Sequence, residues 1–193
     1  MVSRLENIKS WAVTSGPAVE PISALDAKTW LKVTASADDT LITNLIVAAR
    51  QEVESYCNIK LISQTVAEYF SAFPENRGEL VLRFPLVASI SSVAYVDTDG
   101  ANQTFANYNA DLSSQPARLW PNAQTEWPGT KEQLKAVTIT YVCGYTNAAA
   151  VPDAIKTAMY LMIARWYENR EDSVKMLPTA AEKLLNPYRV QLF

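Results

Sequence analysis

The hydrophobic periodicity of this chain changes twice, and this double change constrains the fold more than any other feature. Apolar residues recur at three- and four-residue steps up to about residue 57, alternate with polar residues between 64 and 142, and return to the helical step from 152. Side chains repeat every 3.6 residues in a helix and every two in a strand. The sequence therefore predicts an α+β fold in which a mostly antiparallel β-sheet unit, residues 64–142, is inserted between helices.

The stretch from Val151 to Glu171 is predicted to be the central helix. Pro152 suits the first helical position, and Asp153 places negative charge in the first turn. The apolar stripe of this helix comprises Ile155, Ala158, Met159, Met162, Ile163, Trp166 and Tyr167. Leu161 lies on the reverse side, so the helix is expected to be deeply buried or shared with a second subunit.

The remaining helices are predicted near 24–32, 37–57 and 180–185, and with the helix near 152–170 they are expected to form a helical bundle core. Ser23 and Asp26 resemble a capping box, and Ser36 is expected to cap the second helix. Arg50 and Glu54 are expected on the solvated side of that helix. Residues 1–20 are predicted to be a flexible arm, and residues 21–193 a single domain.

The clearest strand is predicted over Ala136 to Val142, with Val137, Ile139 and Tyr141 on one face. Asp97-Thr98-Asp99-Gly100 is typical of a hairpin turn, and residues 104–108 are expected to return as the partner strand. Trp11 to Thr14 within the arm form a further candidate edge strand. The central region is thus expected to hold several short antiparallel strands.

Composition limits the functions that are open to this chain. It has 193 residues, a formal net charge of −3 and no histidine, so it lacks the commonest general base and metal ligand. Its two cysteines, Cys57 and Cys143, are not in a metal-binding spacing and are expected to be buried thiols in a reducing cytoplasm. We therefore predict no metal site, no cofactor and no enzymatic activity, and we see no signal peptide or membrane span.

Two other functions follow from particular residues. Carboxylates at Asp38, Asp39, Asp97 and Asp99 could serve a hydrolase, although helix termini and turns explain them better. The loop from Trp120 to Trp127 could make the protein a ligand- or carbohydrate-binding module, although two Trp-Pro steps more often hold a long loop against a sheet. A metal-dependent activity screen and tryptophan quenching by glycans would distinguish these alternatives.

Three groups of residues resemble the head–tail connector (adaptor) family of tailed bacteriophages, in particular its larger members with a β-rich insertion. The first group is Pro21-Ile22-Ser23, Leu25-Asp26-Ala27-Lys28 and Leu31-Lys32-Val33. The second is Asp38-Asp39-Thr40-Leu41-Ile42, Ala48-Ala49-Arg50, Val53-Glu54-Ser55-Tyr56 and Leu61-Ile62-Ser63-Gln64-Thr65. The third is Val142-Cys143-Gly144-Tyr145, Val151-Pro152, Trp166-Tyr167-Glu168-Asn169-Arg170-Glu171 and Asn186-Pro187-Tyr188-Arg189. The resemblance depends on the order and spacing of these segments, because each segment alone is common.

The resemblance implies a structural protein of the virion neck, assembled in the bacterial host cytoplasm. Its members form a ring beneath the portal, contact a stopper or tail-completion protein, and let DNA pass through the lumen without sequence-specific binding. Such a subunit can be a monomer before it joins the ring. On this reading residues 21–193 are one connector domain, and no catalysis is implied.

The C-terminal residues are the candidate partner-binding segment. They are Tyr188, Arg189, Val190, Gln191, Leu192 and Phe193. Pro187 is expected to stop the preceding helix and leave this segment extended. An extended, amphipathic end suits strand addition or insertion into a pocket of the portal ring or of a neighbouring subunit; the alternative is a tail that folds back onto its own domain.

Overall fold

The computed structural model describes residues 10–169, 177 and 179–190, and these form two compact units. The β unit comprises the described part of Met1–Gly16 together with Gln64–Gly144. The helical unit comprises Pro17–Ser63 and the described part of Tyr145–Phe193. The chain is thus an α+β protein in which strands lie between helices along the sequence, as the periodicity predicts. The expectation of one domain over residues 21–193 stays a prediction.

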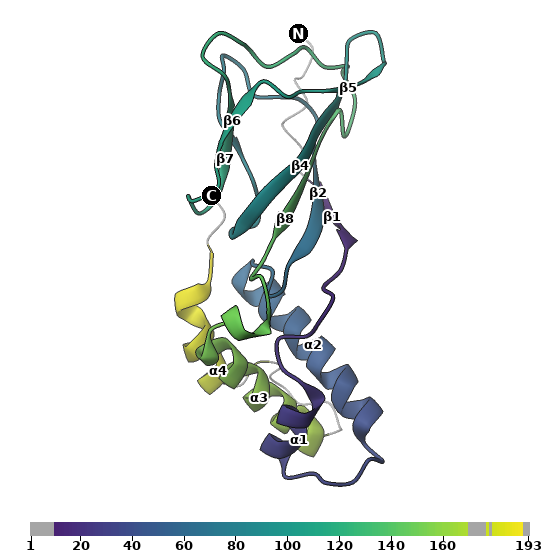
Figure 1. Cartoon of the computed structure of the whole chain (residues 1–193), viewed down its shortest axis with the longest axis vertical. Helices are drawn as coiled ribbons and strands as arrows, with labels where there is room; N and C mark the ends of the chain where they lie inside the picture. Colours follow the sequence, from purple (N-terminus) through teal and green to yellow (C-terminus); the bar gives the residue numbers. More distant parts are fainter. Residues whose placement is uncertain (1–9, 170–176, 178, 191–193) are drawn as a thin grey trace. The chain divides into compact units, whose positions relative to one another are not determined.

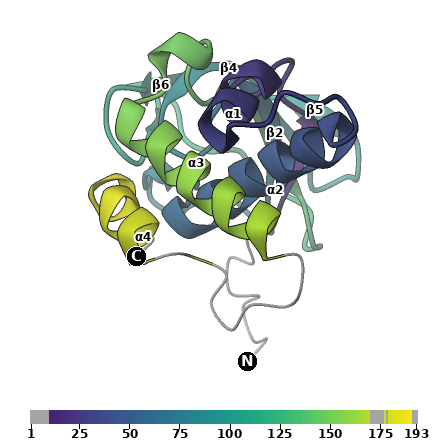
Figure 2. The same ribbon diagram turned by 90° about the horizontal axis from the view of Figure 1, so that it is seen from below.

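The helical unit is arranged around α3. Its helices are α1 (Ala24–Leu31), α2 (Asp39–Cys57), α3 (Asp153–Glu168) and α4 (Thr179–Leu185), with 3-10 turns η1 (Ala148–Ala150) and η2 (Asn186–Tyr188). The α3 helix contacts the other three α-helices (Figure 2). Five residues of its predicted stripe are completely buried: Ile155, Ala158, Met159, Met162 and Ile163. The prediction of a central helix here is confirmed, and none of the described helices is long and apolar enough to span a membrane.

The predicted cap of α1 is confirmed, whereas the starts of α2 and α3 differ from the prediction: Pro152 is the N-cap of α3 and not its first helical residue. Ser23 accepts a hydrogen bond from the backbone N–H of Asp26, and its hydroxyl donates to the Asp26 carboxylate at 2.6 Å. The α2 helix begins at Asp39 rather than at 37, so the predicted cap at Ser36 was wrong. Ser36 instead accepts the Asp39 N–H through its carbonyl, in a turn that precedes the helix. Asn58 ends α2 in the left-handed conformation, as its side chain permits.

The β unit holds two antiparallel sheets (Figure 1). The strands are β1 (Ser10–Ser15), β2 (Gln64–Phe70), β3 (Leu80–Val81), β4 (Val87–Val96), β5 (Asn102–Thr104), β6 (Tyr108–Asp111), β7 (Arg118–Pro121) and β8 (Val137–Cys143). The larger sheet has the order β1-β2-β8-β4-β5, and the smaller has the order β3-β7-β6. The arm strand expected near Trp11 is therefore β1, an edge strand of the larger sheet.

Strand β8 lies at the centre of the larger sheet, between β2 and β4. Val137, Ile139 and Tyr141 are completely buried, whereas the intervening Thr138 and Thr140 are half-buried, so the predicted alternation is confirmed.

The predicted hairpin is confirmed, but the boundaries of its returning strand, residues 104–108, were wrong. The returning strand is β5, which pairs with β4, and Tyr108 begins β6 in the other sheet. The reason is the tightness of the turn: the Asp97 carboxylate accepts the N–H groups of Asp99 and Ala101, and Gly100 takes a φ of 90°.

Each unit has a hydrophobic cluster of its own. In the helical unit the cluster joins all four helices and includes Ile22, Leu61 and Ile62 from the connecting segments. In the β unit, buried side chains of both sheets meet in one cluster, with Ile139 from the larger sheet and Leu119 from the smaller. The alternating strands thus bury their apolar side chains among themselves.

Candidate partner-binding site

The first half of the predicted C-terminal binding segment is described by the structure, and it does not leave α4 in extended form. Asn186, Pro187 and Tyr188 form the 3-10 turn η2, and extended backbone begins only at Arg189. Proline fits near the start of such a turn because it lacks only an N–H that would be unpaired there. The expectation of an extended Tyr188 was therefore wrong. Gln191, Leu192 and Phe193 lie outside the described residues.

Val190 attaches this segment to its own unit. Its N–H donates to the carbonyl of Cys57 at 2.9 Å, and its carbonyl accepts the side-chain amide of Asn58 at 3.1 Å. Tyr188 and Val190 also pack, half-buried, against the helical cluster. The segment as far as Val190 thus folds back onto the C-terminal end of α2.

Arg189, which lies between the half-buried Tyr188 and Val190, is exposed to solvent. Its guanidinium lies 5.3 Å from the centre of the Tyr56 ring, in a cation–π arrangement. The Tyr56 hydroxyl donates to the Asn186 side chain at 2.6 Å, and desolvation together with nearby Glu182 raises the pKa of Tyr56. The described part of the predicted binding segment therefore presents one positioned cation above an aromatic ring.

The candidate carboxylates have structural contacts. Asp38 accepts a hydrogen bond from the Tyr167 hydroxyl at 2.6 Å, and Asp39 forms an ion pair with Lys28. Asp97 holds the β4–β5 turn, and hydrogen bonds from Gln103 and from backbone N–H groups lower its pKa. No group of three or more potential metal-ligating side chains occurs within the described residues. The Asp97 contacts confirm its turn role, whereas the Asp38 side chain makes no capping hydrogen bond and is held by Tyr167 instead.

The Trp120–Trp127 loop is held against its own unit. The Trp127 indole N–H donates to the carbonyl of Gly78 at 2.8 Å. Its ring stacks on Phe73 with centroids 4.6 Å apart and also contacts Phe105. At least one face of the indole is thus occupied by the protein itself, which favours the loop-fixing interpretation over stacking on a sugar or base.

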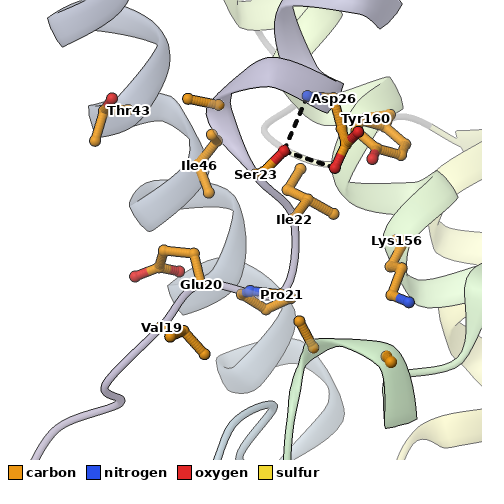
Figure 3. Close-up of a pocket in the computed structure, with 13 residues that line it drawn as sticks. Val19, Glu20, Pro21, Ile22, Ser23, Asp26, Thr43, Ile46, Lys156 and Tyr160 are labelled. Atoms are coloured by element: carbon orange, nitrogen blue, oxygen red, sulfur yellow. Dashed lines mark hydrogen bonds between the residues drawn. The ribbon is translucent and has the colours of Figure 1, made fainter.

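A shallow pocket of about 540 Å³ lies in the helical unit (Figure 3). The segment 19–26 forms one wall, and α2, η1 and α3 supply the others. Its carboxylates already have partners: Glu20 pairs with Arg50 at 2.8 Å, and Asp26 accepts from Ser23. Sequence analysis missed this pocket because its walls come from segments more than a hundred residues apart, and no local motif marks it.

The structure thus defines an α+β protein that carries a β unit between its helices, and comparisons with known proteins identify the family. Among solved structures, the chain is similar to one from the neck of an empty gene transfer agent particle computed with C6 symmetry, with a TM-score of 0.75 and 19% identity over 95% of this chain and 97% of that one. A chain from the virion of a native gene transfer agent particle matches with a TM-score of 0.77 and 18% identity, over 95% and 97% of the two chains. A third, from the neck of a native particle computed with C12 symmetry, matches with a TM-score of 0.67 and 21% identity, over 94% and 97%.

The model of the head completion protein family matches residues 20–190, and the chain belongs to this family. A comparison with curated proteins found no match. Membership confirms the resemblance found in the sequence and the structural role of a head–tail connector that it implies.

Proposed function

We propose that this protein forms a ring in the neck of a phage, prophage or related particle, beneath the portal. There it links the capsid to tail components such as a stopper or tail-completion protein. The observation that carries the proposal is the family match along residues 20–190, which includes both units. The similar solved chains come from neck and virion particles, two of them computed with C6 or C12 symmetry, which supports a ring as the assembled form.

Within such a ring, DNA passes through the lumen without sequence-specific binding. The net charge of −3 suits this role, because clustered cations would hold the phosphate backbone and slow its passage. The protein contributes shape and contacts rather than catalysis. We also propose that residues 21–193 act as one connector domain with the helices as its bundle core. Residues 1–20 act as an N-terminal arm, of which Ser10–Ser15 pair with β2 as strand β1.

Partner binding is assigned to residues 188–193, the C-terminal segment. Val190 supports the start of this segment on the helical unit, and exposed Arg189 offers a cation to the portal or to a neighbouring subunit. Residues beyond Val190 then contribute the apolar side chains Leu192 and Phe193 to the contact.

Electron microscopy of the purified protein mixed with its portal tests the ring. We expect additional ring-shaped density on one face of the portal only when both proteins are present. A portal that remains bare at high protein concentration, in a sample whose protein is folded, would contradict the connector assignment.

Two truncated chains test the two halves of the C-terminal segment, residues 188–190 and 191–193, separately. A chain that ends at Val190 keeps the described hydrogen bonds and should therefore keep its melting temperature while it loses portal binding. A chain that ends at Pro187 also loses the Tyr188 and Val190 contacts and should melt at a lower temperature. Full portal binding by the chain that ends at Val190 would show that Gln191, Leu192 and Phe193 are not the contact.

A further inference from the structure

The turn between β4 and β5 (Figure 1) contains the step Asp99-Gly100. It is the only place in the sequence where glycine follows an aspartate or an asparagine. Both residues are exposed to solvent, and the Asp99 carboxylate makes no hydrogen bond or ion pair with any residue that the structure describes. An unbound carboxyl group therefore lies next to the backbone nitrogen of Gly100, which has no side chain to shield it.

The turn requires glycine at position 100. Its φ of 90° is a conformation that side chains disfavour. A Cβ added there would also lie only 3.3 Å from the Lys131 Nζ. Glycine is at the same time the residue that least hinders its own nitrogen from approaching the preceding side chain. The geometry of the turn thus demands the residue that makes this step chemically reactive.

The chemistry open to such a step is an intramolecular ring closure, which has the entropic advantage of two reacting groups in one chain. The Gly100 nitrogen attacks Cγ of Asp99 and loses its proton, and one carboxyl oxygen leaves as water, so that a five-membered succinimide forms. Water then opens the ring. When it adds to the main-chain carbonyl, the original bond between the Asp99 carbonyl carbon and the Gly100 nitrogen breaks, and the chain continues through Cγ as isoaspartate. One water leaves and one returns, so no oxidant, reductant or enzyme is needed.

Asp97 opposes this reaction by holding the turn closed. Its backbone carbonyl accepts the Gly100 N–H at 3.0 Å, and ring closure must break this hydrogen bond. Its carboxylate accepts the N–H groups of Asp99 at 3.1 Å and of Ala101 at 2.8 Å. The side-chain amide of Gln103 donates to the same carboxylate at 2.9 Å. These contacts restrict the rotation that would bring the Gly100 nitrogen to Cγ of Asp99.

We propose that Asp99-Gly100 is a site of spontaneous backbone modification, at which aspartate converts to isoaspartate, and that the Asp97 carboxylate controls the rate by holding the turn closed. Isoaspartate adds one carbon to the main chain of the turn. Because the Asp97 N–H donates to the Ala101 carbonyl at 2.9 Å across this turn, the added atom is expected to disturb the pairing of β5 with β4. The proposal is independent of the proposed function, since it concerns the isolated chain.

Ageing the purified protein at physiological temperature and neutral pH tests the site. Proteolytic peptides that contain residue 99 are then analysed by electron-transfer fragmentation, which distinguishes isoaspartate from aspartate of equal mass. We expect isoaspartate at position 99 in the wild type unfolded in guanidinium chloride, and formation at least about tenfold slower in the folded wild type, because the hydrogen bonds of the closed turn add to the barrier. Asp97→Ala, shown to be folded by circular dichroism, should form isoaspartate about tenfold faster than the folded wild type.

Asp111→Ala is the matched control. The Asp111 carboxylate likewise accepts backbone N–H groups, those of Ser113 and Ser114, in another turn of the β unit, but no glycine follows it. This variant should modify residue 99 at the wild-type rate. Gln103→Ala removes one donor and keeps the carboxylate, so it should give an intermediate rate, and it replaces Asp97→Ala if that variant does not fold. Absence of isoaspartate in the unfolded chain, equal rates in the folded and unfolded wild type, or equal effects of Asp97→Ala and Asp111→Ala would each overturn the proposal.

Discussion

Glu54 is a buried charge that holds two cations and a backbone group. Its carboxylate lies 3.3 Å from the Lys60 Nζ and 3.4 Å from an Arg50 guanidinium nitrogen, and it accepts the N–H of Leu61 at 3.0 Å. Arg50 reaches Glu20 as well, at 2.8 Å. These side chains are more than nine-tenths buried apart from Glu20, which is 27% exposed. The network therefore connects the segment before α1, the last turns of α2 and the loop that follows α2.

Glu54→Ala should lower the free energy of unfolding by about 3–5 kcal/mol, because it leaves Arg50 and Lys60 buried without this counter-charge. Urea unfolding measures the change. Glu52→Ala, which removes the same kind of side chain from a half-buried position on the same helix, should have a much smaller effect. Equal losses for the two variants would show that the network adds no stability beyond that of an ordinary helix residue.

Cys57 should make the free energy of unfolding fall at alkaline pH. Burial raises the pKa of its thiol from 9.0 to about 11. A group whose pKa is raised by folding contributes stability that is fully present below pH 9.0 and is lost as the pH rises through about 11. The wild type should therefore lose unfolding free energy across this range, and Cys57→Ala should lose less. Urea titrations at about pH 8 and about pH 10.5 measure the difference; identical pH dependence in both proteins would refute a thiol contribution.

Helix α3 is the element around which the other helices of the helical unit pack. It contacts the other three helices, and its apolar stripe is completely buried over five residues. The half-buried Trp166 and Tyr167 complete the stripe near the C-terminal end of the helix. Periodicity predicts the inward face because most of α3 packs in the core. It could not predict the start of α2, where a turn closed by Ser36 competes with the first helical turn.

Ile163→Ala should reduce the free energy of unfolding by about 2–5 kcal/mol, the range for truncating a buried isoleucine. Arg165→Ala on the same helix is the comparison, and it should cost far less because its side chain is only half-buried. Thermal melts of the two variants, measured together, check both values. Small and equal shifts would mean that Ile163 contributes little to the core.

At the scale of the whole molecule, the described residues form two hydrophobic clusters, one in each unit. The α-helices of the described part of the chain all belong to the helical unit, whereas Trp11, Trp120 and Trp127 belong to the β unit. Circular dichroism and tryptophan fluorescence can therefore follow the units separately.

The variant Trp30→Phe/Trp166→Phe retains only the tryptophans of the β unit and makes this separation complete. If residues 21–193 are one cooperative domain, the helix signal of circular dichroism and the fluorescence of this variant should change at one melting temperature. Two separate transitions would show that the units unfold independently and would contradict the single-domain prediction.

The sequence by itself determined the class of fold, the central helix, the buried face of β8 and the family. These depend on local periodicity and on the order of short segments, which are present before the chain folds. Only the tertiary structure decided that Arg50 and Glu54 are buried, although their sequence pattern indicates a solvated helix face. Charges become buried when partners outside the helix, such as Glu20 and Lys60, compensate them, and the 3.6-residue pattern of the helix does not record such partners. Likewise, the tertiary structure alone decided that Val190 returns to Cys57 and that β1 pairs with β2, because both depend on pairing between segments that are far apart in the chain.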